Sequence, residues 1–208
     1  EKNVEATLRT YVQHCNNARF IFAGSQRHVM GNMFLTPSRP FYQSVSMMHL
    51  ERIPLEEYVR FACMHFKRAG KEMEESAVTT VYQQFEGITW YIQKVLNTLY
   101  DMTPEHGVCK VEMVSEAIRQ IIDSFRYTYS EILFRLPEKQ KELLIAITKE
   151  GRAKALTSGT FIKKYKLASA SSVQAALKGL LEKDFVTQEM GICQIYDRFL
   201  GIWLKENY

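Results

Sequence analysis

The segment from residue 167 to residue 196 constrains the fold most, because its hydrophobic period changes from that of a helix to that of a strand. Its first part, LASASSVQAALKGLLEKDFV, has apolar residues at the spacing of one buried helix face: Val173, Ala176, Leu177, Leu180 and Leu181. Ser171, followed three residues later by Gln174, predicts a capping box at the start of this helix. The second part, FVTQEMGICQIYD, alternates around Gly191 and predicts a β-hairpin.

Further helices flank this segment on both sides. Residues 138–150 predict a helix that stops at Gly151, residues 158–165 predict a short second helix, and the stretch around Trp203 predicts a final one. The resulting order is three helices, a two-stranded wing and a last helix. This order predicts a winged helix-turn-helix domain over residues 136–208.

Residues 54–135 predict a helical lid domain of three or four helices. Pro54 marks a helix start and Gly70 a stop, a second helix ends at Gly87, and a third ends before Pro104. A long amphipathic helix then follows at about residues 111–133. The aromatic residues here repeat at helical spacing, so we expect them to form a core.

The first 53 residues have a different pattern, in which helices alternate with strand candidates. Phe20, Ile21, Phe22 and Ala23 predict a strand buried on both faces, and residues 44–50 predict a second one. Two parallel strands are too few to form a stable sheet alone. We therefore expect the end of an α/β core that continues in a longer chain, within a fold that is otherwise mainly α.

Positive charge is concentrated in the predicted winged helix. The chain carries +4, whereas residues 137–184 alone carry +5, from ten Lys or Arg and five acidic residues. A cationic winged helix is a candidate nucleic-acid-binding module. The residues expected to make such contacts are Lys163, Lys164, Lys166, Ser172 and Lys178.

The predicted recognition helix is nevertheless poor in side chains that read bases. Its outward face offers Lys178, small residues and Glu182, and the wing tip Glu189-Met190-Gly191 is acidic. We therefore favour docking of the winged helix onto another protein domain or onto its own ATPase core. A winged-helix DNA-binding transcriptional regulator is the alternative.

Catalytic and metal-binding motifs are scarce in the sequence. The four cysteines are scattered without a CxxC pair, which predicts reduced core thiols of a cytoplasmic protein and no metal site. Ser25 has no G-x-S-x-G elbow around it. The chain also lacks a G-x-x-x-x-G-K-[ST] phosphate loop. No secretory leader or membrane span is expected.

Taken in order, these pieces resemble the C-terminal half of P-loop ATPases of the archaeal-ATPase type, in the signal-transducing branch of the AAA+ class. RFIFAGSQRHVMGNMF is similar to the family's sensor-1 strand, and SRPFYQSVSMMHLERIPLEEYVRF to the last core strand leading into the lid. FEGITWYIQKVLNTLY resembles the lid stretch in which a glycine precedes a helix near the nucleotide base. The resemblance covers nearly all 208 residues.

The resemblance implies site residues that composition alone does not. Ser25 and Arg39 would be sensor-like catalytic residues, and Ser25, Gln26, Arg27 and Gly87 would contact the nucleotide. The alternative interpretation is that Gly24-Ser25 only turns the chain and the arginines are solvated. The family's Gly-x-Pro is replaced by Gly87-Ile88-Thr89.

The resemblance also implies partners and cofactors. The phosphate loop and the Walker acid would precede Glu1, in a missing N-terminal ATPase core that is the first expected partner. ATP and Mg would bind the parent protein, and no cofactor is expected in this piece, which would not hydrolyse ATP alone. Docking to a further protein is expected, DNA is the less favoured partner, and no membrane is expected.

Overall fold

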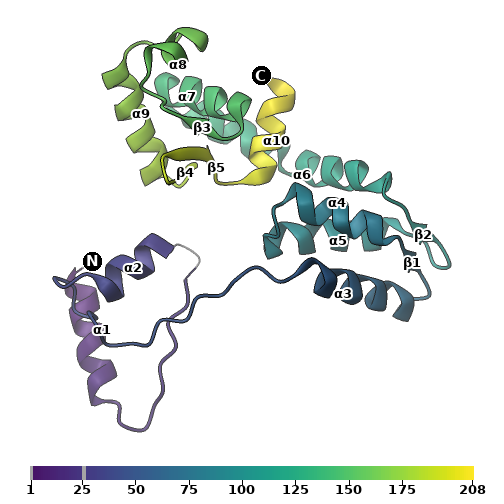
Figure 1. The fold of residues 1–208 in the computed structure, drawn as a ribbon, viewed down its shortest axis with the longest axis horizontal. Coiled ribbons are helices and arrows are strands. Elements are labelled where there is room, and N and C mark those ends of the chain that lie inside the picture. The colour runs from purple at the N-terminus through teal and green to yellow at the C-terminus, as the bar shows by residue number, and fades with distance from the viewer. Residues whose placement is uncertain (1, 25–26) are drawn as a thin grey trace. The chain divides into compact units, whose positions relative to one another are not determined.

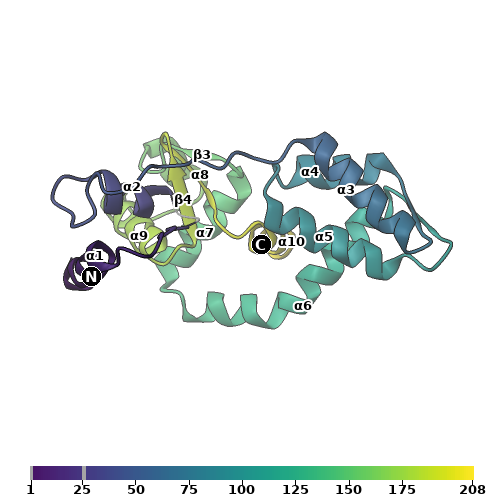
Figure 2. The same ribbon diagram turned by 90° about the horizontal axis from the view of Figure 1, so that it is seen from below.

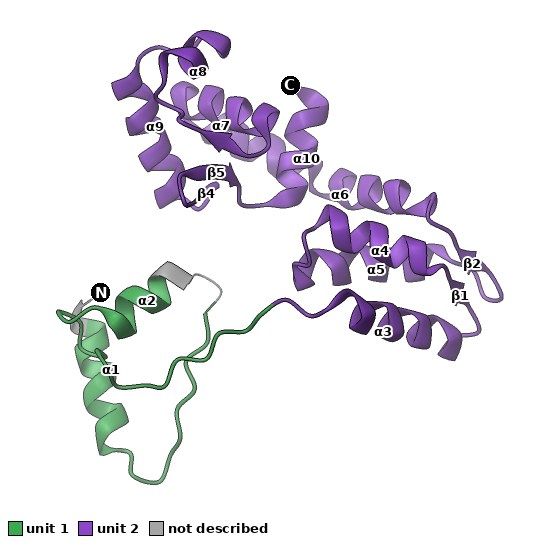
Figure 3. Cartoon of the chain, in the orientation of Figure 1, with its two compact units in different colours: residues 1–51 green, residues 52–208 purple. Residues whose placement is uncertain are grey.

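The computed structural model describes residues 2–24 and 27–208 and divides the chain into two compact units (Figure 3). The N-terminal unit comprises residues 1–51 and the C-terminal unit residues 52–208. The N-terminal unit contains α1 (Lys2–His14) and α2 (Arg27–Leu35). An aromatic cluster holds it together, with ring centroids 5.3 Å apart for Phe22–Phe34 and Phe22–Phe41 and 5.6 Å apart for Phe34–Phe41.

The two strands expected in the N-terminal unit are not formed. Residues 19–24 and 44–50 are neither helical nor paired with a strand in the part of the chain that the structure describes. Ile21, expected to be buried on a sheet, is 92% exposed. An extended segment becomes a strand only when its backbone groups find a partner, and the described residues offer none.

The C-terminal unit begins with a helical bundle, the name used below for residues 55–135. Its elements are α3 (Leu55–Arg68), β1 (Glu72–Met73), α4 (Glu75–Gln84), α5 (Thr89–Met102), β2 (Val108–Cys109) and α6 (Met113–Arg135). β1 and β2 form a small parallel pair, with Glu72 opposite Val108 and Met73 opposite Cys109. The sequence pattern did not predict this pair, because two-residue strands show no alternation.

The winged helix follows and ends the chain. Its elements are α7 (Glu138–Glu150), β3 (Ala153–Lys154), α8 (Gly159–Lys164), α9 (Ala170–Glu182), β4 (Val186–Glu189), β5 (Ile192–Ile195) and α10 (Arg198–Asn207). The wing is antiparallel, with Val186 opposite Ile195, and its sheet order is β3-β5-β4. Met190 and Gly191 both have positive φ, as a two-residue type I′ turn requires.

The structure corrects the cap of α9. Ser169, not Ser171, is the N-cap residue: its side chain accepts a hydrogen bond from the backbone N–H of Ser172, at 3.2 Å. The helix therefore begins earlier than the sequence pattern indicated. Several consecutive serines satisfy the same capping preference, and the sequence alone did not show which one the helix uses.

One hydrophobic core runs through the whole C-terminal unit. Buried residues from Tyr58 in α3 to Leu204 in α10 form a single contiguous cluster. The long helix α6 connects the bundle to the winged helix, as both ribbon views show (Figures 1 and 2). Its buried residues Val114 and Leu133 lie near opposite ends of the helix, so α6 contributes to the core along its length. Among the described residues, no helix is long and apolar enough to cross a membrane.

We expect truncation of the α9 core to destabilise the protein strongly. Leu180 is fully buried, so Leu180→Ala should lower the free energy of unfolding by about 2–5 kcal/mol through lost burial and a residual cavity. The control Glu182→Ala, on the exposed side of the same helix, should change it by less than about 0.5 kcal/mol. Urea denaturation followed by circular dichroism measures both, and equal losses would contradict this packing.

Candidate functional site

Two tyrosines of the helical bundle bind the N-terminus of α10. The Tyr91 hydroxyl, from α5, accepts a hydrogen bond from the backbone N–H of Arg198 at 3.0 Å and donates to the carbonyl oxygen of Tyr196 at 3.2 Å. The Tyr129 hydroxyl, from α6, donates to Oδ2 of Asp197 at 3.0 Å. Burial raises the pKa of both tyrosines, so they remain neutral donors at physiological pH.

Asp197 connects this contact to the helix itself. Its Oδ1 accepts hydrogen bonds from the backbone N–H groups of Phe199 and Leu200, at 2.9 and 3.3 Å, which caps α10. One carboxylate thus caps a helix of the winged helix with one oxygen and binds Tyr129 of the bundle with the other. Asp197 therefore holds the start of α10 through the helix cap and through its bond to Tyr129 of the bundle.

Glu86 adds an ion pair beside the tyrosines. Its carboxylate lies 3.0 Å from the guanidinium of Arg198 and 3.4 Å from that of Arg152, which precedes β3. The Arg198 side chain is only 22% exposed, whereas that of Arg152 is 62% exposed, so solvent screens the second pair more strongly. We call Glu86, Tyr91, Tyr129, Asp197 and Arg198 the α10 clasp.

Aromatic packing lies next to the α10 clasp. Phe199 of α10 packs against Phe85, Tyr91 and Trp90, with ring centroids 5.2, 5.2 and 5.9 Å apart. Phe85 and Tyr91 stack at 5.3 Å with an interplanar angle of 12°. Such aromatic pairs stabilise a fold by more than the burial of their apolar area alone. The clasp and these rings make the bundle and the winged helix one packed unit.

The turn that carries Glu86 has a strained backbone. Glu86 and Gly87 have φ values of 52° and 74°, in the left-handed region that only glycine adopts without strain. A Cβ on Gly87 would lie 2.9 Å from the Tyr82 hydroxyl oxygen and 3.0 Å from Cδ of Arg52. Gly87, expected from the resemblance to contact a nucleotide, is thus buried and closely surrounded.

The other residues implied for a nucleotide site lie in the N-terminal unit. Ser25 and Gln26 fall outside the described residues, and Arg27 is the first residue of α2. Arg39 forms an ion pair with Glu5 of α1, and both side chains are largely buried. Its charge is therefore balanced within this unit.

The five residues expected to contact nucleic acid differ in their surroundings. Lys164 is bound to Oε1 of Glu150 at 2.6 Å, and the same oxygen accepts a hydrogen bond from the Tyr165 hydroxyl. These bonds lower the pKa of Glu150, and the carboxylate raises the pKa of Lys164. The remaining four side chains occupy different environments. Lys178 lies 3.9 Å from Glu182, Ser172 lines a cavity, and Lys163 and Lys166 are exposed.

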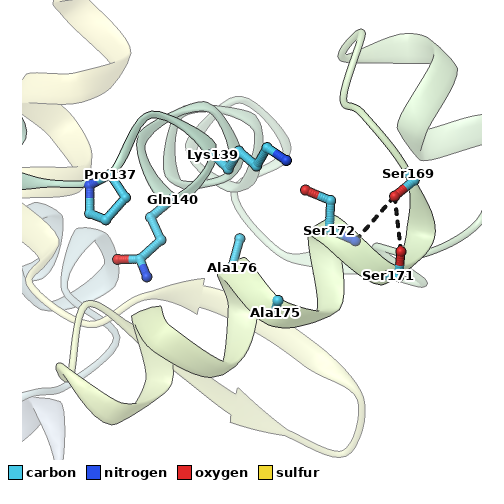
Figure 4. Close-up of a pocket in the computed structure, with 8 residues that line it drawn as sticks. All are labelled: Pro137, Lys139, Gln140, Ser169, Ser171, Ser172, Ala175 and Ala176. Atoms are coloured by element: carbon cyan, nitrogen blue, oxygen red, sulfur yellow. Dashed lines mark hydrogen bonds between the residues drawn. The ribbon is translucent and has the colours of Figure 1, made fainter.

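That cavity lies between the starts of α7 and α9 and measures about 490 Å³ (Figure 4). Its lining includes Lys139 and Gln140 of α7 and three serines of α9 and its cap: Ser169, Ser171 and Ser172. Ser169 and Ser171 are hydrogen-bonded to each other at 3.0 Å. The two helices approach closely at Gly179, where a Cβ would lie 2.2 Å from Nε2 of Gln140. Part of the face expected to point outward therefore packs against α7.

Metal-binding and nucleophilic sites have no support in the described part of the chain. It contains no group of three or more His, Cys, Asp or Glu residues that could hold a metal ion. The four cysteines are free thiols, and burial raises the pKa of three of them: Cys63, Cys109 and Cys193. A raised pKa leaves the thiol protonated and weakly nucleophilic.

Two comparisons with known proteins agree with this geometry. A family model described as a probable winged helix domain matches residues 127–206. The C-terminal part of this chain is a winged helix. The fold is also similar to that of the Walker-type ATPase of Pyrococcus abyssi, with a TM-score of 0.67 and 14% sequence identity.

The chain spans only part of that relative. The alignment covers 98% of this chain and 57% of the Pyrococcus abyssi chain. No curated protein sequence matches this chain. The fold of nearly the whole chain is therefore similar to that of part of a Walker-type ATPase, and the winged helix lies at the C-terminal end of this chain.

Substitutions at two glycines test the turn beside the α10 clasp. Gly87 and Gly191 have similar φ values, 74° and 76°, but a Cβ at Gly191 meets nothing within 4 Å. Gly191→Ala should cost about 1–2 kcal/mol for left-handed strain alone. Gly87→Ala should cost at least about 1 kcal/mol more, because Tyr82 and Arg52 must move. Equal losses in urea denaturation would contradict this close packing.

Proposed function

We propose that this chain is the C-terminal part of an ATP-dependent switch ATPase of the AAA+-like class. In this proposal the helical bundle is its lid, and the winged helix is its docking module. The observation that carries the proposal is the similarity of fold to a Walker-type ATPase over 98% of the chain. The order of the elements, with a helical bundle followed by a winged helix, supports the same assignment.

ATP and Mg belong to the parent protein in this proposal. We expect the described residues not to bind them without the N-terminal ATPase core, because the chain has no phosphate loop and Arg39 is ion-paired to Glu5. The missing N-terminal ATPase core would supply the phosphate loop. This chain would contribute to the nucleotide site the residues Ser25, Gln26, Arg27 and Gly87. Arg39 would have to break its ion pair with Glu5 before it could bind a phosphate.

The α10 clasp gives the proposed switch a physical connection. Glu86 precedes Gly87, the residue proposed to lie near the nucleotide base, and the same Glu86 binds Arg198 at the start of α10. Movement of this turn therefore displaces a group bonded to the winged helix. A change of nucleotide state would reach the docking module through these contacts and not through a flexible linker.

We propose a protein as the docking partner of the winged helix. The lysines of α8 and α9 are partly neutralised, since Lys164 binds Glu150 and Lys178 lies beside Glu182. The wing tip carries Glu189 and Met190, and Met190 is fully exposed. An exposed methionine next to a carboxylate suits a protein surface better than a phosphate backbone.

Nucleotide-dependent hydrogen exchange in the complete protein tests the connection. We expect ATP and ADP to produce different protection of the α10 amides. The double variant Glu86→Gln/Arg198→Gln should remove that difference while ATP hydrolysis continues, because the ion pair is lost and the phosphate site is not altered. Arg135→Gln is the matched control, since its ion pair with Glu131 lies on the exposed surface of α6.

Two results would contradict the proposal. If the complete protein binds no ATP, or its reading frame holds no phosphate loop before Glu1, the ATPase assignment fails. If ATP binds and the α10 amides respond equally in wild type and double variant, the ATPase assignment stands. The clasp then does not transmit the change.

A DNA titration separates docking from the alternative function. We expect no saturable binding of duplex DNA in fluorescence anisotropy at about 150 mM salt, a typical physiological ionic strength. The alternative predicts binding with a steep salt dependence that Lys163→Glu/Lys166→Glu abolishes, because each phosphate contact releases counterions. Lys205→Glu in α10, outside the basic segment, is the control for nonspecific charge effects.

A further inference from the structure

A second cavity, of about 560 Å³, lies between α3 and α5. Four residues with aromatic rings of Phe, Trp or Tyr line it: Phe61 and Phe66 from α3, and Trp90 and Tyr100 from α5. Phe61 and Trp90 are 46% and 57% exposed, so a ligand can reach both rings. The volume falls within the range of sites for small organic ligands.

The polar side chains of this cavity are free to bind a ligand. Gln93, Lys94 and Asn97 of α5 line it and are exposed. Within the described chain, none of these three side chains forms a hydrogen bond or ion pair. His65 of α3 completes the wall, with its ring centroid 4.4 Å from that of Phe61. The lining thus contains two basic side chains, Lys94 and His65, which carry positive charge when protonated, and no carboxylate.

The aromatic walls are held in place by their neighbours. Lys71 Nζ lies 4.1 Å from the ring centroid of Tyr100 and donates to the Tyr100 carbonyl oxygen at 2.6 Å. Trp90 packs edge-on against Tyr91 at 4.9 Å and contacts Phe199 at 5.9 Å. Rings fixed in this way lose little conformational entropy when a ligand binds.

We infer that the cavity between α3 and α5 binds a small planar aromatic anion. The ligand ring stacks on Trp90 or Phe61, the amides of Gln93 and Asn97 bind polar groups at the ring edge, and Lys94 pairs with the negative group. Aromatic faces supply affinity for any flat ring, and the charge-assisted hydrogen bond selects an anion. This inference rests on the cavity itself and does not depend on the proposed ATPase function.

Three related compounds test separately whether binding depends on the aromatic ring and on the negative charge. Naphthalene-2-sulfonate is an aromatic anion, naphthalene-2-sulfonamide has the same ring system without the charge, and cyclohexanesulfonate has the charge without the aromatic ring. Each is titrated into the ¹⁵N-labelled chain, and binding is followed by the indole N–H of Trp90 and the side-chain amides of Gln93 and Asn97. The indole of Trp203, which is 6% exposed, reports changes elsewhere.

The inference makes a specific prediction for the probes and variants. Naphthalene-2-sulfonate should shift the three reporter signals saturably, with an affinity about tenfold above that of the sulfonamide and of cyclohexanesulfonate. Lys94→Gln should lower the affinity for naphthalene-2-sulfonate to that for the sulfonamide and leave the affinity for the sulfonamide unchanged. Trp90→Ala should weaken the binding of both naphthalene probes about tenfold. Lys67→Gln, an exposed lysine of α3 outside the cavity, should change nothing.

Three outcomes would overturn the inference. In the first, the reporter signals do not move, or they move without saturating. In the second, all three probes bind alike. In the third, Lys67→Gln and Lys94→Gln weaken the sulfonate equally, so that surface charge alone accounts for binding. The amide spectrum of each variant shows whether it is folded, and Trp90→Phe replaces Trp90→Ala if the latter is not.

Discussion

The structure of the C-terminal unit depends on how the N-terminus of α10 is bound. A helix N-terminus leaves backbone N–H groups without intrahelical partners, and here Asp197 and the Tyr91 hydroxyl satisfy three of them. The second oxygen of Asp197 is bound by Tyr129, and Arg198 is bound by Glu86. The bonds of Tyr91, Tyr129 and Glu86 join the winged helix to the bundle, whereas Asp197 caps α10 from within the winged helix. The start of α10 is thus stabilised in part by residues of the bundle, which makes the two parts interdependent.

The sequence predicted most helices because their apolar period and their end signals agree. Residues 138–150, bounded by Pro137 and Gly151, were predicted with the bounds that α7 has in the structure. The wing hairpin was predicted from alternation around Gly191. The strands expected near residues 20–23 and 44–50 were wrong, because a run of apolar residues does not specify a partner strand. Among the described residues, Phe22 packs into an aromatic cluster instead.

The α10 clasp could not be predicted from the sequence. Tyr91 and Arg198 are 107 positions apart, and Glu86 and Arg198 are 112 positions apart. No local pattern indicates pairs at such separations. The sequence offered one signal for this site, Gly87, which precedes an amphipathic helix and therefore marks a turn. It did not show that Glu86 would face α10. The candidate nucleic-acid residues show the same limit, since counting lysines does not reveal that Lys164 is bound to Glu150.

We expect the bundle and the winged helix to unfold as one cooperative unit, and the two tryptophans test this directly. Trp90 lies in α5 and Trp203 in α10, so Trp203→Phe and Trp90→Phe leave one fluorescent reporter in each part. Each variant is unfolded in urea, and its tryptophan fluorescence and far-ultraviolet circular dichroism are recorded on the same sample. In each variant, fluorescence and circular dichroism should report the same transition midpoint for the C-terminal unit. A winged helix that unfolds at a urea concentration clearly different from that of the bundle would contradict it.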